Sequence, residues 1–148
     1  MSGNSKKKQD ISEWIKLSDY DLGTARAMQR AGKYLYVLFC CQQAIEKRLK
    51  AVVINITGEF PPKTHDLIRL MELAKIGLTA KQQIFLRKLT TYYIETRYPE
   101  EVKELSKKVT KILAGVYLKD SEEVIKCIDQ LLKLTGSPAG LQSYLEAM

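Results

Sequence analysis

The chain has 148 residues, of which 45% are hydrophobic and 28% charged, so its composition is that of one ordinary globular domain and excludes a disordered or fibrous chain. The three cysteines, Cys40, Cys41 and Cys127, are odd in number and exclude a simple disulfide framework, which favours a reducing, cytoplasmic location. The net charge of +7 permits an anionic partner, whereas no apolar run reaches the roughly 18 residues of a membrane span and no signal peptide is visible.

Helical periodicity dominates the first third of the chain, and no strand alternation is found anywhere. The first helix is predicted to begin at Asp10, an N-cap with Glu13 three residues later, and to end at Gly32. The second helix is predicted to run from about Lys33 to Thr57, and the glycine that follows closes it.

Shorter helices are predicted in the middle of the chain. Thr64 is expected to cap a short third helix, and Thr79 opens a fourth. That fourth helix should stop at Arg97 or Tyr98, because Pro99 disfavours helical geometry in the residue before it.

The last third is predicted to contain an amphipathic helix over 102–113 and a final helix capped by Asp120. We therefore predict an all-α bundle of four to five helices over residues 10–135. A disordered basic leader is expected over 1–9 and a loose tail over 136–148, where Gly, Ser and Pro cluster.

A polar ladder runs along the second predicted helix. On a helical wheel at about 100° per residue, Gln42 falls within the apolar arc of residues 35–56, Glu46 lies at its margin, and Lys50 lies one turn further out. A buried amide and a half-buried carboxylate destabilise the fold unless they are hydrogen-bonded. The ladder therefore indicates a polar site where a simple bundle would have leucine.

His65 is the sole histidine and follows the predicted cap Thr64. At a helix N-terminus it could contribute to an anion site or carry a proton near neutral pH. The alternative, which composition alone favours, is a histidine that hydrogen-bonds the second helix and orders the connector. No second histidine or thiolate pair stands at ligand spacing, so we expect no metal and no cofactor.

Arg97 ends a predicted helix, where a cation interacts favourably with the macrodipole. It is either a simple C-terminal cap or a guanidinium fork aimed at phosphate or at Glu46. Tyr92 and Tyr93 could stack on a base, but tyrosines at helical spacing are more often part of the core.

Three motifs, taken in order, resemble the HEPN (higher eukaryotes and prokaryotes nucleotide-binding) domain family. They are Gln42-Gln43-Ala44-Ile45-Glu46-Lys47, Thr64-His65-Asp66-Leu67 and Thr96-Arg97-Tyr98-Pro99. The resemblance extends over roughly 14–134 and implies a bundle of four or five helices, usually a homodimer. Such proteins often associate with a minimal nucleotidyltransferase.

Some members of that clan are metal-independent ribonuclease toxins, whose signature is an arginine followed after four to six residues by a histidine. Here the corresponding positions hold Val102, Lys103 and Glu104. Because that mechanism needs an imidazole as acid and base beside the arginine, the resemblance does not imply ribonuclease activity for this chain.

The leading hypothesis is a non-catalytic binding module that forms a homodimer, pairs with a nucleotidyltransferase and holds a nucleotide or RNA. Its expected site comprises eight residues: Gln42, Gln43, Glu46, Lys50, His65, Asp66, Arg97 and Tyr98. One alternative is a divergent ribonuclease of a toxin–antitoxin pair that uses His65 and Arg97 across the dimer. In the other, the same polar residues form only an internal structural network.

Overall fold

The computed structural model describes residues 2–95 and 97–134, and over these residues the chain forms six helices and no strand. The helices are α1 (Ser2–Ala31), α2 (Tyr34–Thr57), α3 (Leu67–Leu73), α4 (Ala80–Thr90), α5 (Pro99–Lys107) and α6 (Lys111–Leu134). The all-α bundle is thus confirmed, with more helices than the four to five expected. The tail predicted over 136–148 lies outside the described residues.

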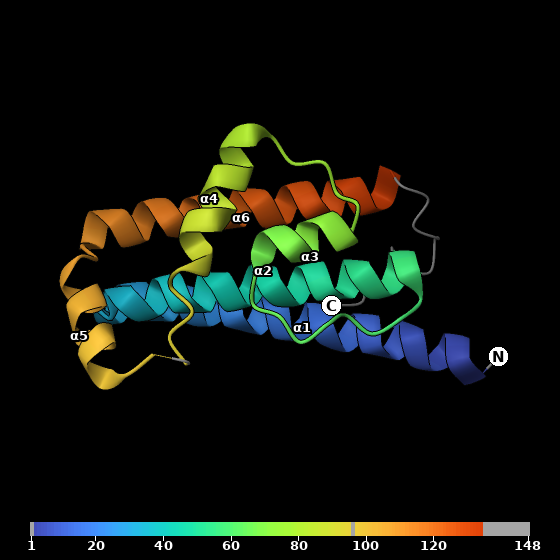
Figure 1. Cartoon of the computed structure of the whole chain (residues 1–148), viewed down its shortest axis with the longest axis horizontal. Coiled ribbons are helices and arrows are strands. Elements are labelled where there is room, and N and C mark those ends of the chain that lie inside the picture. Colours follow the sequence, from blue (N-terminus) through green and yellow to red (C-terminus); the bar gives the residue numbers. More distant parts are fainter. Residues whose placement is uncertain (1, 96, 135–148) are drawn as a thin grey trace.

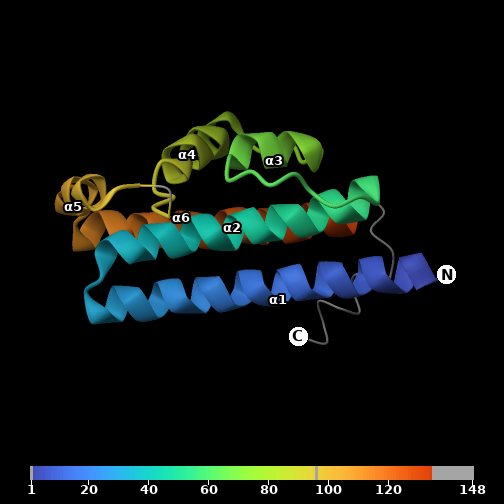
Figure 2. The ribbon, with the colours of Figure 1, turned by 60° about the horizontal axis from the view of Figure 1, so that its bottom comes forward.

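The three long helices form the body of the bundle (Figure 1). Helices α1 and α2 lie antiparallel to one another, and α6 packs against both of them. Figure 2 shows α3 and α4 on the opposite side of α2 from α1, while α5 lies at one end. Within the described residues, no helix combines the length and the apolar character needed to cross a membrane.

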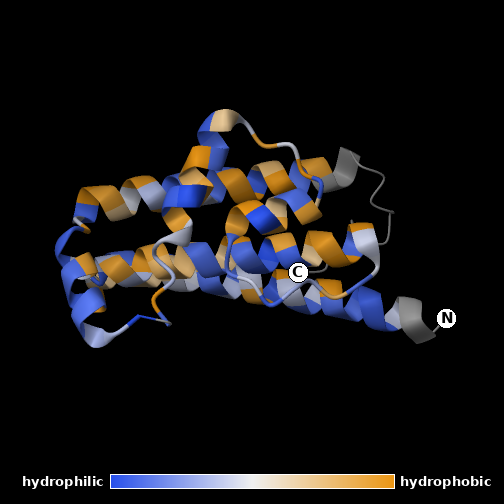
Figure 3. Cartoon of the chain, in the orientation of Figure 1, coloured by the Kyte–Doolittle hydropathy of each residue, from blue (hydrophilic) through white to orange (hydrophobic). Residues whose placement is uncertain are grey.

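Helix α2 lies at the centre of the core, where it contacts α1, α3, α4, α5 and α6. Val37, Leu38, Ile45 and Leu49 have no exposed surface. Apolar residues are spread along α2 and α6 and are few on α5 (Figure 3), and α5 has no buried residue. Because apolar burial contributes about 25 cal/mol per Å², the long helices carry most of the stability.

Two predicted helix ends are confirmed. Helix α2 ends at Thr57, and Gly58 follows in the left-handed conformation with φ 74°, where its N–H donates to the carbonyl of Ile54. Helix α4 begins after Thr79, whose hydroxyl accepts from the N–H of Gln82 while the Gln82 side chain accepts from the N–H of Thr79.

The predicted start of the first helix is wrong: α1 begins at Ser2 rather than Asp10, so residues 2–9 of the expected leader are helical. Lys and Gln are good helix formers, and extending a helix that already exists is far easier than nucleating one. Ile11 and Ile15 are buried and anchor it. The side chain of Lys7 reaches the end of α2, where its Nζ lies 3.2 Å from the point that a Cβ would occupy if Gly58 carried one.

The cap of the third helix is also corrected. Asp66, not Thr64, is the N-cap of α3, since its carboxylate accepts from the N–H groups of Ile68 (3.0 Å) and Arg69 (3.3 Å). Thr64 instead accepts from the N–H of Asp66 at 3.2 Å. His65 therefore belongs to the connector that precedes α3, and not to its first turn.

Helix α4 ends at Thr90, well before the predicted stop at Arg97 or Tyr98. The Thr90 and Thr91 hydroxyls donate to the carbonyls of Leu86 and Lys88, and such side-chain bonds compete with continued helix. Pro99 stands at the first position of α5, where its missing N–H costs nothing, so it starts a helix instead of only ending one.

In the last third of the chain, the helices are interrupted at 108–110 and not before Asp120 as predicted. Helix α6 is one continuous helix, and Asp120 lies inside it rather than at its N-cap. Thr110 accepts from the N–H of Leu113 at 3.1 Å and so occupies the capping position instead. Ala114, Val124 and Ile128 share the buried face of this single helix.

A buried arginine joins the three long helices. Arg48 of α2 is 6% exposed, and its guanidinium binds Asp19 of α1 at 2.6 Å and Asp129 of α6 at 2.7 Å. Burial acts to lower the pKa of Arg48, but the hydrogen bonds and charges of Asp129 and Asp19 outweigh it, so this pKa is raised. Arg48 therefore stays charged and satisfied between the helices.

Candidate functional site: a carboxylate–imidazole cluster on helix α2

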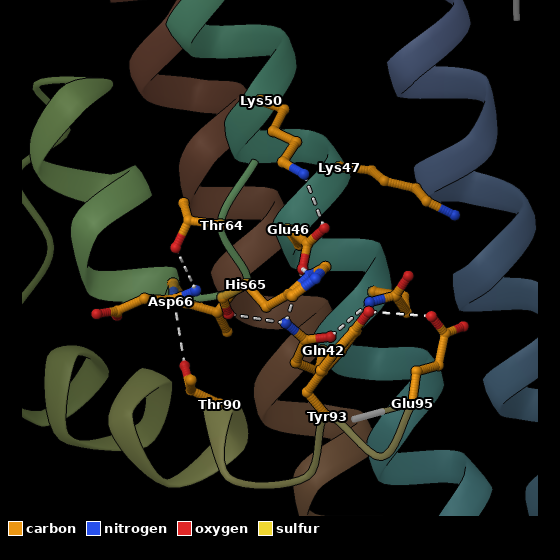
Figure 4. Close-up of polar contacts among 12 residues, drawn as sticks. Gln42, Glu46, Lys47, Lys50, Thr64, His65, Asp66, Thr90, Tyr93 and Glu95 are labelled. Atoms are coloured by element: carbon orange, nitrogen blue, oxygen red, sulfur yellow. Dashed lines mark hydrogen bonds and ion pairs between the residues drawn. The ribbon is translucent and has the colours of Figure 1, made fainter. Parts of the chain in front are cut away.

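The centre of the site is the carboxylate of Glu46, which is only 3% exposed. Its Oε1 accepts a hydrogen bond from Gln42 Nε2 (3.0 Å) and lies 2.8 Å from His65 Nδ1, while its Oε2 accepts from Lys50 Nζ at 3.0 Å (Figure 4). A buried carboxylate is tolerated only when its charge and lone pairs are compensated. Three partners from two segments provide that compensation.

The Gln42 amide fixes the connector against α2. Gln42 is fully buried; besides Glu46, its Nε2 donates to the backbone carbonyl of His65 at 3.1 Å, and its Oε1 accepts from Gln43 Nε2 at 2.7 Å. Both ends of the amide are thus engaged, which sets its orientation. His65 is held to α2 through its backbone and through its ring.

The imidazole of His65 lies flat on the ring of Tyr93, with centroids 3.6 Å apart and planes at 16°. Tyr93 also packs against Phe39 with a centroid distance of 5.8 Å, and its hydroxyl donates to Glu95 at 3.0 Å. Burial raises the pKa of Tyr93 to about 12, and the hydrogen bond to Glu95 is the second largest cause of this rise. The phenol therefore stays protonated. Tyr93, expected in the core, is instead a wall of the site.

One edge of the imidazole is available to a ligand. The His65 side chain is 42% exposed, its Nδ1 is engaged by Glu46, and its Nε2 has no partner among residues 2–95 and 97–134. A carboxylate that holds one ring nitrogen fixes the direction of the other, as in many imidazoles that bind ligands or transfer protons.

The ladder suggested that Lys50 lies towards water, but its side chain is buried and only 8% of the residue is exposed. The indole of Trp14 covers its ammonium, with Nζ 5.4 Å from the ring centroid. Trp14 belongs to α1, and which ladder residue its indole covers is decided by the packing of α1 against α2. Lys50 therefore balances Glu46 from inside the fold.

The other expected site residues do not join this cluster. Arg97 donates to the carbonyl of Thr91 and pairs with Glu101 at 3.5 Å, so the alternative in which its guanidinium is aimed at Glu46 is wrong. Asp66 caps α3, and Tyr98 is 75% exposed. The turn after Thr91 carries Arg97 into its own local contacts.

Two cysteines of α2 lie in environments that keep their thiols protonated. Burial raises the pKa of Cys40 to about 11 and that of Cys41 to about 12, so both remain thiols near neutral pH. In the described ranges, no group of three or more His, Cys, Asp or Glu side chains could hold a metal ion.

These features define an all-α helical bundle with a compensated polar cluster on its central helix. A family model described as the HEPN domain matches residues 11–134, and the chain belongs to the HEPN domain family.

Solved structures agree with this fold. The crystal structure of TT1696 from Thermus thermophilus is similar to it with a TM-score of 0.67 and 21% identity, covering 81% of this chain and 96% of that one. ST0689, an archaeal HEPN homologue, is similar with a TM-score of 0.65 and 19% identity, covering 82% and 97%. No curated protein sequence matches this chain.

Proposed function

We propose that this protein is a non-catalytic HEPN binding module that holds a nucleotide at the His65 cluster. The supporting observation is the half-exposed imidazole, fixed by the buried Glu46 and stacked on Tyr93. A base would lie against these rings and meet the free Nε2 edge, because aromatic and imidazole faces bind nucleobases by stacking.

The phosphate contact differs from the one first expected. Lys50 is occupied by Glu46 and covered by Trp14, and Arg97 is paired with Glu101. Lys63 is exposed, belongs to the same connector as His65, and has no ion pair among the described residues. We therefore assign the phosphate contact to Lys63.

Isothermal titration with ATP and GTP tests this proposal. Tyr93→Leu is expected to weaken nucleotide binding about 5-fold to 100-fold, because one base–aromatic stack contributes about 1–3 kcal/mol. The matched control is Tyr20→Leu on α1, a tyrosine that is 74% exposed, which should bind like wild type. Absent heats, or equal heats for wild type and Tyr93→Leu, would contradict nucleotide binding here.

One observation favours the divergent ribonuclease as a second candidate. Glu46 orients the imidazole through Nδ1 and leaves Nε2 outward, an arrangement suited to proton transfer. Incubation with an oligoribonucleotide separates the two candidates: cleavage by wild type that His65→Ala abolishes would favour the nuclease, and intact RNA would exclude it.

We further propose that the module is a homodimer that associates with a minimal nucleotidyltransferase. Ile112 and Val116 stand four residues apart on α6, hence on the same side of the helix, and are 80% and 49% exposed. Contiguous exposed apolar surface often marks an interface. Light scattering should give twice the monomer mass for wild type, and Ile112→Glu should weaken the dimer at least about tenfold because it places a charge in an apolar contact.

The outcome that contradicts the dimer is a wild-type protein that is monomeric at every concentration tested. The nucleotidyltransferase association is checked by co-expression with a nucleotidyltransferase encoded beside this gene, followed by tandem purification. Failure of the two proteins to purify together would remove that part of the proposal.

A further inference from the structure

The proton of the His65 imidazole has a defined position. Both oxygens of the Glu46 carboxylate accept hydrogen bonds, Oε1 from Gln42 and Oε2 from the ammonium of Lys50. A carboxylate paired with an ammonium group accepts hydrogen bonds and donates none, so the 2.8 Å contact between Glu46 and Nδ1 of His65 places the proton on Nδ1. In the neutral imidazole, the lone pair is therefore on Nε2.

The Nε2 lone pair of His65 is held in one direction, and the fold does not use it. The ring is stacked on Tyr93 with a centroid distance of 3.6 Å, and Gln42 holds the backbone carbonyl of His65 at 3.1 Å (Figure 4). The side chain is 42% exposed, and Nε2 has no partner among residues 2–95 and 97–134. A carboxylate at one ring nitrogen makes the other more basic, and an imidazole so arranged is suited to attack an electrophile.

The surroundings of His65 also suit the product of phosphoryl transfer to Nε2. A ring that carries a phosphoryl group on Nε2 and keeps its Nδ1 proton is positively charged, and Glu46 compensates that charge across the same 2.8 Å contact. The phosphoryl group itself is an anion. Lys63, two residues before His65 in the connector, is exposed and makes no ion pair with the described residues. An anionic and a cationic side chain are thus available for the two charges of the product.

We propose that His65 is a phosphorylation site whose Nε2 takes a phosphoryl group from a small molecule with a good leaving group, such as an acyl phosphate or a phosphoramidate. The Nε2 lone pair forms the N–P bond. The bond between phosphorus and the leaving group breaks, and its electron pair departs with that group. The Nδ1 proton stays on the ring, hydrogen-bonded to Glu46. This modification does not depend on nucleotide binding at the same cluster.

Incubation of the full chain with acetyl phosphate and with phosphoramidate tests this site. Wild type is expected to gain one acid-labile phosphoryl group, seen by intact-mass spectrometry, and His65→Ala to gain none. Because His65 is the sole histidine, any phosphohistidine is assigned to it. Phosphorus NMR distinguishes the two ring nitrogens, and only the Nε2 isomer is expected, since Glu46 engages Nδ1. The control is N-acetylhistidine, whose nitrogens are both free and which should give both isomers at early times.

The contribution of Lys63 is measured with a matched pair of variants. Lys63→Gln is expected to slow phosphorylation about twofold to fivefold, the effect of one exposed charge pair. Lys81→Gln removes the same charge from an exposed lysine on α4 and should react like wild type. Equal rates for the two variants would overturn the role of Lys63.

Three outcomes would overturn the phosphorylation site itself: no phosphoryl group on wild type, a phosphoryl group on Nδ1, or equal modification of His65→Ala. Calorimetric titration with ATP and GTP is a separate measurement. Nucleotide binding can therefore fail while His65 is phosphorylated, and the reverse result is equally distinguishable.

Discussion

Glu46→Ala is expected to lower the free energy of unfolding by about 3–5 kcal/mol and the melting temperature by about 10 °C for a domain of this size. The substitution leaves the ammonium of Lys50 buried at 8% exposure and removes an acceptor from Gln42 and His65. An uncompensated buried charge is among the few causes of so large a loss. Thermal unfolding followed by circular dichroism measures it.

The control removes both charges together. Glu46→Leu with Lys50→Met should regain most of the stability, because apolar residues of similar volume replace a buried pair at little or no cost. If the double variant is as unstable as Glu46→Ala, the loss does not come from the stranded charge. If Glu46→Ala is destabilised but ATP and GTP bind it unchanged, the cluster is only a structural network.

Arg48→Met is expected to destabilise the bundle by about 2–4 kcal/mol, and the midpoint of urea unfolding should fall accordingly. Arg48 is 6% exposed and its side chain links α2 to Asp19 and Asp129 on two other helices. The side chains of these carboxylates are 50% and 25% exposed, so water compensates them in part when the guanidinium is lost.

A surface pair provides the comparison for Arg48. Arg26 and Glu122 bind at 2.7 Å, but their side chains are 46% and 40% exposed, so Arg26→Met should cost no more than about 1 kcal/mol. Similar losses for both variants would show that burial does not determine the contribution of Arg48.

The sequence predicted helix ends correctly where residues close in the chain determine them. The extent of α2 and the start of α4 after Thr79 depend only on neighbouring residues, and both are confirmed. The end of α4 and the start of α6 were misplaced, because the hydroxyls of Thr90, Thr91 and Thr110 determine them. Threonine occurs both inside helices and at their ends, so the presence of a threonine does not by itself locate the end of a helix.

The candidate site was predictable to the same extent. Residues four apart on one helix face the same side, so the contacts among Gln42, Glu46 and Lys50 follow from spacing. His65 meets them because a connector places it there. The position of Arg97 depends on a turn of irregular geometry after Thr91, and helical spacing carries no information about it.

Glu46 and Arg48 stand two residues apart, hence about 200° apart around α2. One carboxylate faces the connector, and one guanidinium faces α1 and α6. Turning α2 about its own axis, or sliding it by one residue, would withdraw both groups from their partners at once. The two ionic contacts lie on opposite sides of α2 and together fix its rotation about its own axis. Apolar packing alone distinguishes between rotations of the helix far less sharply.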